Sequence, residues 1–452
     1  MDITNLILKL QSKVSDNTYN QLAVTKSVDL MKAGQVNHVN AIVDLPAASA
    51  STGKMYYVRG LGIYYSNSTN WVSIDTINQI PQGFMYAWGF NNAGQLGDNT
   101  VTQRTSPVSV VGNFIDWCQV SAGTRNSLAV RTNGTAWGWG QNFYGSLGDN
   151  STTSRSSPVS VVGGFTDWCQ ISAGGFFGNN IRFSLGVRQN GTLWAWGYNA
   201  QGQIGDSTTV SKSSPVSVVG GFTNWCQVSG GSDFALAVRQ NGTAWGWGNN
   251  SNGNLGDNST TTRTSPVSVV GGFTDWCQVS AALSQSQHSL GVRQNGTAWA
   301  WGNGSNGRLG DNSTVSKSSP VSVVGGFTDW CQVSGGNSFS IGLRSGGTLW
   351  AWGYNGSGRL GNNSTTDSSS PVSVVGGFTD WCQADAGVGN AAAVRTNGTI
   401  WGWGQNNYGQ LGEGLQAFSR SSPVSVIGGL TNWCQVSAGF GHVLGIRYNL
   451  DS

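Results

Sequence analysis

The chain has 452 residues, only 10% of them charged, and a formal net charge of +3. No block of Lys and Arg occurs, which argues against partners that are bound through phosphate groups, such as nucleic acids or anionic membrane surfaces. The 21 Trp exclude simple disorder, and the absence of eighteen consecutive apolar residues predicts no membrane insertion. The start MDITNLILKL lacks the pattern of a secretory signal. We therefore expect a soluble protein that is made in a cytoplasm.

Residues 1–42 are predicted to form a helical segment for attachment or oligomerisation. Over residues 3–14, apolar side chains recur with helical spacing and share one face: Ile3, Leu6, Ile7, Leu10 and Val14. An amphipathic helix of this kind suits docking on a particle or self-association. The alternative is a helix that only packs beside the rest of the chain.

Residues 43–75 are predicted to form a small β-module, followed by a linker over residues 76–83. Three short strands are expected, at residues 55–58, 63–65 and 71–74, because β-forming residues there are separated by turn sequences. The pattern Leu-Pro, then Gly before an apolar pair, then Tyr-Tyr and Trp-Val resembles short modules in virion structural proteins of tailed bacteriophages, including cyanophages. That resemblance covers about thirty residues.

Residues 84–448 contain a unit of roughly fifty residues that recurs seven times. A Trp-Gly marker begins at Trp88, Trp139, Trp196, Trp247, Trp301, Trp352 and Trp403. A Trp-Cys-Gln marker begins at Trp117, Trp168, Trp225, Trp276, Trp330, Trp381 and Trp433. Nearly all variation in length falls in the interval just after Trp-Cys-Gln-Val-Ser, which is where a repeat protein tolerates insertions and often binds.

Each unit shows four strand signals, exemplified by WCQVSAG, SLAVR, TAWGWG and SPVSVVG. The Asn-Gly pair between the second and third signals predicts a tight hairpin. In TAWGWG, Trp137 and Trp139 share one face while Gly138 leaves the other face bare, so a bulky face can nest on the small-residue face of a neighbour. The region begins with half a unit and ends with the complementary half. This pattern predicts an all-β, seven-bladed propeller of four-stranded antiparallel blades, in which one blade is built from both ends of the repeat region.

The unit VSAG-x-x-H-S-L-G-V-R-x-N-G-T-x-W-x-W-G-x-N-x-x-G-x-L-G-D resembles the regulator of chromosome condensation (RCC1) repeat. The resemblance covers residues 84–448 and implies a seven-bladed propeller that works through protein–protein contacts. The family histidine stands here only at His288 and His442, while other copies carry residues such as Asn126 or Phe339. This weakens any function that depends on that histidine.

The periodic residues are interpreted as structural. The seven cysteines, one in each Trp-Cys-Gln, are expected to be free and buried, with Cys277 on the face opposite Trp276 and Gln278. The recurring Arg at the end of the second strand is expected to pair with the Asp or Asn before each Trp-Cys. The recurring Asp after Leu-Gly is expected to cap a turn.

No catalytic site, metal site or cofactor is predicted. The sequence Gly302–Gly307 satisfies GxGxxG but has no following helix, so it is not expected to bind a dinucleotide. The repeated GDNST segments offer too few oxygens for calcium, and no paired carboxylates or Ser/His/Asp set stands out. A non-enzymatic protein is therefore expected.

Candidate binding residues lie in the intervals that escape the repeat, because equivalent loops of all blades should emerge on one face. Phenylalanines on an inserted loop are typical interface anchors. The alternative is that some of these side chains fill the mouth of the ring. The candidates are Arg125, Asn126, Phe176, Phe177, Asn179, Asn180, Arg182, Phe183, Asp233, Gln285, Gln287, His288, Asn337, Asn390, Phe440 and His442.

Two functions are compatible with these features. The first is a phage virion structural protein of the tail, baseplate, fibre or head, which docks to other virion proteins through its N-terminal region. On the particle it would be a homo-oligomer, and its loop face would bind a host surface glycan or protein or a neighbouring subunit. The alternative is a soluble regulatory or inhibitory propeller, similar to GTPase exchange factors or β-lactamase inhibitors.

Overall fold

The computed structural model describes residues 82–449, except 177, 179–180, 284–286 and 417, and four short strands between residues 36 and 73. The chain divides into two compact units, Met1–Gln82 with Asn449–Ser452, and Gly83–Tyr448. In the first unit, β1 (Val36–Val39), β2 (Met55–Val58), β3 (Gly62–Ser66) and β4 (Trp71–Ser73) form one sheet in that order. β1 pairs with β2 in parallel and is a strand that the sequence did not predict. The helix predicted over residues 3–14 lies outside the described residues.

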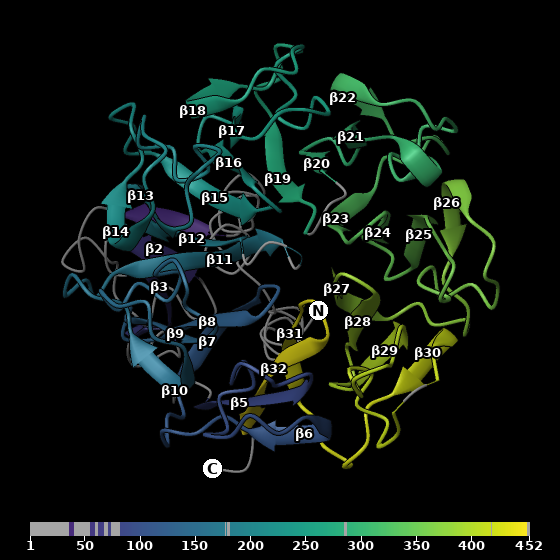
Figure 1. Ribbon diagram of the computed structural model, residues 1–452, viewed down its shortest axis with the longest axis horizontal. Coiled ribbons are helices and arrows are strands. Elements are labelled where there is room, and N and C mark those ends of the chain that lie inside the picture. The colour runs from purple at the N-terminus through teal and green to yellow at the C-terminus, as the bar shows by residue number, and fades with distance from the viewer. Residues whose placement is uncertain are drawn as a thin grey trace. The chain divides into compact units, whose positions relative to one another are not determined.

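The second unit is a ring of seven four-stranded antiparallel sheets, which confirms the predicted fold class (Figure 1). We number the blades by the order in which their third strands occur. Blade 2 contains β7 (Trp117–Ala122), β8 (Asn126–Arg131), β9 (Ala136–Gly140) and β10 (Arg155–Ser160). Its first strand is the innermost, since the first strands of neighbouring blades contact one another around the ring.

Blades 3 to 7 repeat this arrangement. Blade 3 contains β11 (Trp168–Phe176), β12 (Ile181–Arg188), β13 (Leu193–Gly197) and β14 (Lys212–Ser217), and blade 4 contains β15 (Trp225–Gly230), β16 (Phe234–Arg239), β17 (Ala244–Gly248) and β18 (Arg263–Ser268). Blade 5 contains β19 (Trp276–Ala281), β20 (His288–Arg293), β21 (Ala298–Gly302) and β22 (Lys317–Ser322), with a short 3-10 helix η5 (Ser305–Gly307). Blade 6 contains β23 (Trp330–Gly335), β24 (Phe339–Arg344), β25 (Leu349–Gly353) and β26 (Ser368–Ser373), and blade 7 contains β27 (Trp381–Ala386), β28 (Asn390–Arg395), β29 (Ile400–Gly404) and β30 (Arg420–Ser425).

Blade 1 closes the ring with strands from both ends of the propeller sequence. Its order is β31 (Trp433–Ala438), β32 (His442–Asn449), β5 (Gln82–Gly89) and β6 (Arg104–Ser109). The two inner strands therefore come from the C-terminal end and the two outer strands from the N-terminal end, as the incomplete first and last units predicted. Figure 1 shows this blade as the place where the yellow and dark blue ribbons meet. Such a closed ring leaves no end blade to be capped.

The alternation of Trp and Gly in the third strand joins neighbouring blades. The indole Nε1 of Trp139 donates a 3.0 Å hydrogen bond to the carbonyl of Gln95 in blade 1, and its ring lies against Gly97. Gly97 has a φ of +70°, and a Cβ there would lie 2.8 Å from that nitrogen. The equivalent indole of every blade makes the same bond to the preceding blade, at 2.9–3.0 Å.

The glutamine of each Trp-Cys-Gln joins its blade to the following one. Gln170 of β11 donates to the carbonyl of Val228 at 3.0 Å and accepts from the amide of the same residue at 2.9 Å. All seven glutamines accept from a backbone amide of the next blade, and the bond from Gln435 to Val120 completes the circle. A buried side-chain amide thus substitutes for strand pairing between blades.

A second ring of hydrogen bonds lies two residues further along the inner strands. Six serines, such as Ser121, accept from a backbone amide of the next blade. In blade 7 the position is Asp385, whose carboxylate accepts from Ala438 N at 2.8 Å and from the hydroxyls of Ser334 and Ser437. Burial raises the pKa of Asp385, although these hydrogen bonds act in the opposite direction.

The cysteine beside each glutamine occupies a β-bulge, which overturns the predicted orientation of the glutamine. The pairing register shifts between Trp276 and Gln278, so that Cys277 is the extra residue. Cys277 packs with Trp330 of the next blade, on the side where Gln278 bonds to Val333, while Trp276 packs with the preceding blade. The prediction that Trp276 and Gln278 share a face is wrong, because the bulge breaks the alternation between them. The seven cysteines are free, but they are half-buried or exposed rather than buried.

The recurring arginine pairs as predicted in six blades. Arg131 donates to Asp116 at 2.7 Å, and its guanidinium lies 4.3 Å from the centre of the Phe114 ring. Five further blades repeat the bond to Asp or Asn. In blade 1, Leu430 stands in place of the phenylalanine, and Arg447 Nε has no hydrogen-bond partner among the described residues. These half-exposed pairs contribute little stability each, so we interpret them as fixing the hairpin ends.

The glutamine ring should dominate the stability of the blade contacts. We expect Gln170→Met, which keeps the volume but removes both bonds, to lower the free energy of unfolding by about 2–4 kcal/mol, because Val228 then keeps a buried unpaired amide and carbonyl. Gln294→Met, at an exposed position, is the control and should change it by less than about 0.5 kcal/mol. Urea unfolding followed by Trp fluorescence measures both. Equal effects would contradict the assigned role.

The cysteines should be free but unreactive in the native protein. Desolvation raises the pKa of the Cys169 and Cys277 thiols from 9.0 to about 11. The native thiolate fraction at pH 8 should therefore be about 100-fold below that of the denatured chain. Titration with a thiol reagent should detect seven thiols in denaturant without reductant, and slow reaction before denaturation. Fewer than seven thiols in denaturant would contradict the assignment.

Candidate protein-binding face

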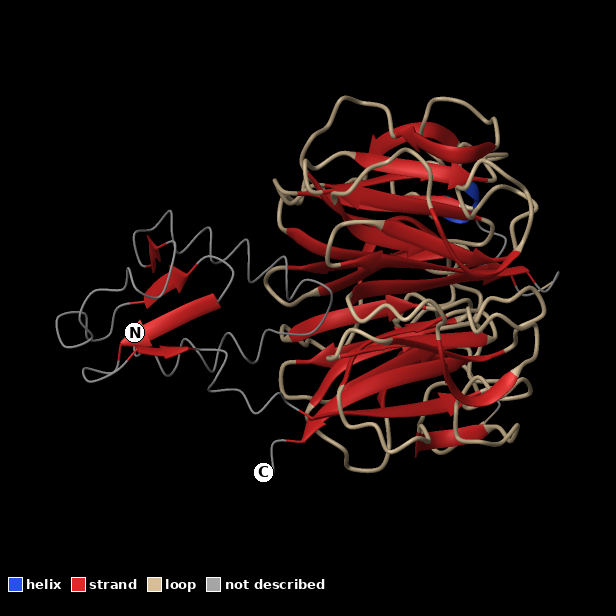
Figure 2. Ribbon diagram, turned by 90° about the vertical axis from the view of Figure 1, so that its left-hand side faces the viewer, coloured by secondary structure: helices blue, strands red, loops and turns tan. Residues whose placement is uncertain are grey.

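The turns that vary between blades emerge on one face of the ring. The inner strand of each blade ends where its second strand begins, and the connection from third to fourth strand returns to the same edge because the strands are antiparallel. Figure 2 shows the blades from the side, with loops at both edges. We call the edge that carries residues 123–125, 439–441 and their equivalents, together with the third-to-fourth connections, the variable face.

The structure separates the sixteen predicted binding residues into three groups. Seven are buried: Asn126, Arg182, Phe183, Asp233, His288, Asn390 and His442. Five are half-buried at the variable face: Arg125, Phe176, Gln287, Asn337 and Phe440. Phe177, Asn179, Asn180 and Gln285 lie outside the described residues, as do the helix residues Ile3, Leu6, Ile7, Leu10 and Val14.

Most of the buried group fills the space beneath the inner turns. Phe183, Phe339 and His442 each lie at the start of a second strand, against a glycine of the preceding turn. His442 Nε2 lies 3.1 Å from Ser127 Oγ of blade 2, and the buried His288 makes the equivalent contact with Ser340 at 2.9 Å. These side chains join blades, so a phenylalanine, histidine or asparagine at this position is interpreted as part of the packing.

Asp233 belongs to a polar network at the edge of the variable face. Its carboxylate accepts hydrogen bonds from Ser232 at 2.7 Å, Asn249 at 3.1 Å and Gln287 at 3.2 Å. Burial raises the pKa of Asp233, and these bonds oppose the shift. The network fixes the turn between β15 and β16 against the following blade.

An aromatic cluster with one arginine lies where blades 7, 1 and 2 meet. The ring centres of Phe90 and Tyr408 are 4.4 Å apart, and Phe440 lies 6.1 and 5.9 Å from them. The guanidinium of Arg125 lies 5.5 Å from the Phe90 ring centre, within the range of a cation–π contact. All four side chains are half-buried. The cluster unites three consecutive blades through residues that do not repeat.

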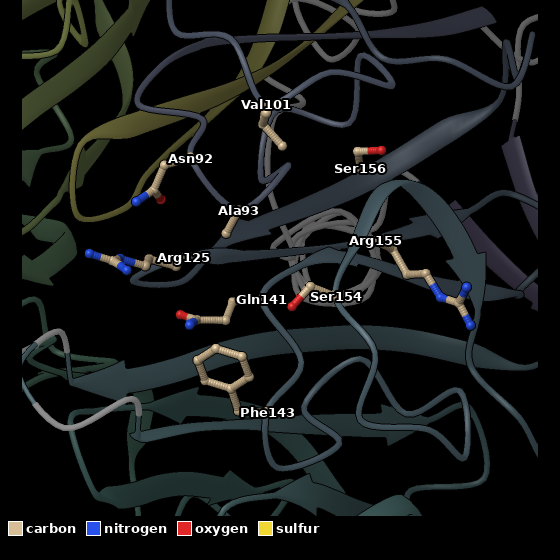
Figure 3. Close-up of a pocket in the computed structure, with 9 residues that line it drawn as sticks. All are labelled: Asn92, Ala93, Val101, Arg125, Gln141, Phe143, Ser154, Arg155 and Ser156. Carbon is tan, nitrogen blue, oxygen red and sulfur yellow. The ribbon is translucent and has the colours of Figure 1, made fainter.

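A cavity of about 440 Å³ adjoins this cluster between blades 1 and 2. Figure 3 shows Arg125 between Asn92 and Gln141, with Phe143 below them. Phe143 is 52% exposed and lines this cavity beside Gln141. Val101, Arg155 and Ser156 line the opposite part of the cavity.

Phe90, Phe143 and Tyr408 were not among the predicted binding residues. They lie in the third-to-fourth connections, which are almost constant in length and were therefore treated as scaffold. The available signal was a change of residue type within the pattern WG-x-N-x-x-G, where aromatic residues appear in some copies and Asn or Ser in others.

The described residues contain no group of three or more His, Cys, Asp or Glu side chains arranged to hold a metal ion. Within the same residues, no helix is long and apolar enough to cross a membrane. The described residues of the variable face include Arg, amide and aromatic side chains and the carboxylate of Asp233.

These observations define a closed propeller of repeated blades with one variable face. Comparison with known families matches residues 169–445 to the RCC1-like domain, and residues 82–130 and 133–178 to the regulator of chromosome condensation (RCC1) repeat. The chain belongs to the RCC1-like domain family. The resemblance of the repeats to this family is confirmed.

Two curated relatives cover most of the propeller. The chain is 28% identical to the ultraviolet-B receptor UVR8 of Arabidopsis thaliana, over 75% of this chain and 76% of that protein. It is 26% identical to the E3 ubiquitin-protein ligase HERC2 of Homo sapiens over 74% of this chain, but this match spans only 7% of HERC2. Among solved structures, Prp20p of Saccharomyces cerevisiae superposes with a TM-score of 0.72 at 18% identity, covering 83% of this chain and 93% of that one. The last similarity concerns the fold alone.

The hypothesis of a phage virion protein is wrong. The sequence similarities are to eukaryotic proteins, UVR8 and HERC2, and they extend over about three quarters of the chain, whereas the phage-like pattern covers about thirty residues. The predicted virion location is therefore wrong as well. So are the predicted partners, since the relatives found are UVR8 and HERC2 and not virion proteins. The virion prediction rested on the resemblance of about thirty residues in the N-terminal region and not on the repeats.

The buried histidines should make the propeller sensitive to acid. Burial lowers the pKa of His442 from 6.5 to about 3, so the folded state takes up this proton less readily than the unfolded state. The uncharged His442 imidazole makes its full contribution to the free energy of unfolding above pH 6.5. This contribution is lost as the pH falls from 6.5 toward 3. Between pH 7 and 4.5 the wild type should lose about 2 kcal/mol more unfolding free energy than His442→Asn, a residue that blades 2 and 7 carry at this position. Denaturant titrations at both pH values measure this difference, and parallel losses would contradict it.

Proposed function

We propose that this chain is a regulatory or inhibitory protein that binds another protein through its variable face and catalyses no reaction. The observation that carries the proposal is the cluster of Phe90, Arg125, Tyr408 and Phe440 beside the exposed Phe143. Aromatic and arginine side chains supply most of the binding energy at protein interfaces. They lie on blades whose other surfaces carry mainly Ser, Thr, Asn and Gly.

The relatives support a binding role without assigning a partner. UVR8 is named as a receptor, and the structure of Prp20p is described together with its binding to Gsp1p and histones. The ligase activity in the name of HERC2 is not transferred, because the shared propeller is a small part of that protein. Both kinds of function expected from the sequence, exchange factor-like and inhibitor-like, use a propeller face in this way.

The proposal predicts that binding depends on the cluster. Phe143→Ala and Arg125→Ala should each weaken the complex with the partner about 30-fold or more, as truncation of an interface anchor does. The full chain would be used to isolate the partner, and dissociation constants would then be measured with the purified partner by titration calorimetry.

Ile115→Ala is the matched control, because Ile115 is 41% exposed and precedes an inner strand, at the opposite edge of the ring. It should bind like the wild type. Equal dissociation constants for all three variants would show that the variable face is not the binding surface. Weaker binding by Ile115→Ala alone would show the same.

A further inference from the structure

Arg182 is a buried cation whose guanidinium has no hydrogen-bond partner among the described residues. It lies in β12 of blade 3, opposite Gly175 in the strand pair, and is 1% exposed. Its Nε, Nη1 and Nη2 atoms make no hydrogen bond within the part of the chain that the structure describes. A buried guanidinium with five unused donors is costly unless an acceptor is supplied.

Other buried arginines of the propeller differ from Arg182 in this respect. Arg308, which is 5% exposed, donates to the carbonyl of Ser305 at 2.7 Å and to Asn306 Oδ1 at 3.0 Å. Arg359, which is 7% exposed, donates to the carbonyl of Asn337 at 2.9 Å. The lack of acceptors at Arg182 is therefore a local property of the junction between blades 2 and 3.

Two neighbouring groups make this junction suitable for an anion. Thr124 of blade 2 is buried, and its hydroxyl also lacks a hydrogen-bond partner among the described residues. A Cβ at Gly175 would lie 3.1 Å from Thr124 Oγ1 and 3.2 Å from Arg182 Cγ, so both groups face the space that this glycine leaves. Arg125, the residue after Thr124, is close enough for its charge to act on Arg182.

The electrostatics agree with this geometry. Burial first, and then the like charge of Arg125, lower the pKa of Arg182 to about 9, and no carboxylate opposes the shift. Arg182 thus remains charged at neutral pH, beside a second cation. Arg125 also lines the cavity of about 440 Å³ on the variable face, so one of the two arginines is accessible from that cavity.

We propose that the junction of blades 2 and 3 binds an oxyanion, a carboxylate or phosphate group, through Arg182 and Arg125 with a hydrogen bond from Thr124. Guanidinium groups bind both kinds of oxyanion through paired hydrogen bonds. The group is supplied by a free anion or by an acidic or phosphorylated side chain of a protein bound to the variable face. The second source rests on the proposed function, whereas the site itself does not.

The site is tested first with inorganic phosphate and the full chain. At matched ionic strength, phosphate should raise the melting temperature of the wild type about 2 °C or more above its value in chloride, because it binds the folded state only. Arg182→Met, which keeps the apolar stem, should melt at or above the wild-type temperature in chloride and should not respond to phosphate. Arg125→Met should reduce phosphate affinity about 10-fold in titration calorimetry.

Arg308→Met is the matched control, since Arg308 is equally buried but already has acceptors. It should melt below the wild type and keep the full response to phosphate. Loss of the response in Arg308→Met, or its retention in Arg182→Met, would overturn the proposal. If Arg182→Met does not fold, the Arg125→Met titration decides.

The two sources are separated with a hexaglutamate peptide and a hexaglutamine control. A response to phosphate but not to hexaglutamate assigns the site to a free anion, and a stronger response to hexaglutamate assigns it to a carboxylate of a bound protein. Response to neither phosphate nor hexaglutamate would overturn the proposal. None of these measurements uses the partner, so the oxyanion site can fail while protein binding stands, and the reverse.

Discussion

The propeller depends on the hydrogen bonds that a glutamine of each inner strand makes to the backbone of the next blade. Neighbouring blades pack face to face and cannot pair strand to strand. Hydrophobic packing alone would therefore not determine the position of one blade relative to the next along the axis of the ring. A side-chain amide that accepts from one specific backbone N–H fixes that position, as between Gln170 and Val228. The serine two residues later and the indole of the third strand fix the same relation at two further points. The repetition of Trp-Cys-Gln-Val-Ser with few changes follows from this requirement, because a blade without these residues would lose its hydrogen bonds to the next blade.

The same constraint leaves the variable face free to differ. The repeated hydrogen bonds between blades lie along the inner strands and behind the Leu-Gly turns. They do not involve the side chains at the tips of the inner turns or at the first positions of the third-to-fourth connections. Phe90, Arg125 and Phe440 occupy such positions and meet only because the ring places blades 1, 2 and 7 side by side. A uniform scaffold thus supports a local surface that occurs once.

The sequence predicted the fold well because its signals are local and are repeated seven times. Asn-Gly hairpins, the Trp and Gly alternation and the two incomplete end units together determined blade number, strand order and closure. It predicted the orientation of Gln278 wrongly, because a bulge depends on strand pairing rather than on alternation. The site was predicted only in part. Length variation pointed to the edge of the ring that carries the proposed binding cluster, but it could not distinguish Phe183 and His442, which are buried between blades, from Arg125 and Phe440, which remain accessible. That distinction depends on contacts between blades that local sequence does not show, such as the one between His442 and Ser127.

The central claim is that the repeated segments build the ring and one variable face recognises a partner. Hydrogen–deuterium exchange of the full chain, with and without its isolated partner, tests this claim most directly. The account predicts protection of backbone amides around residues 90–95, 123–125, 141–145 and 439–441, with no change around residues 112–116 and 428–432 at the opposite edge. Protection at the opposite edge, or spread evenly over all seven blades, would contradict it.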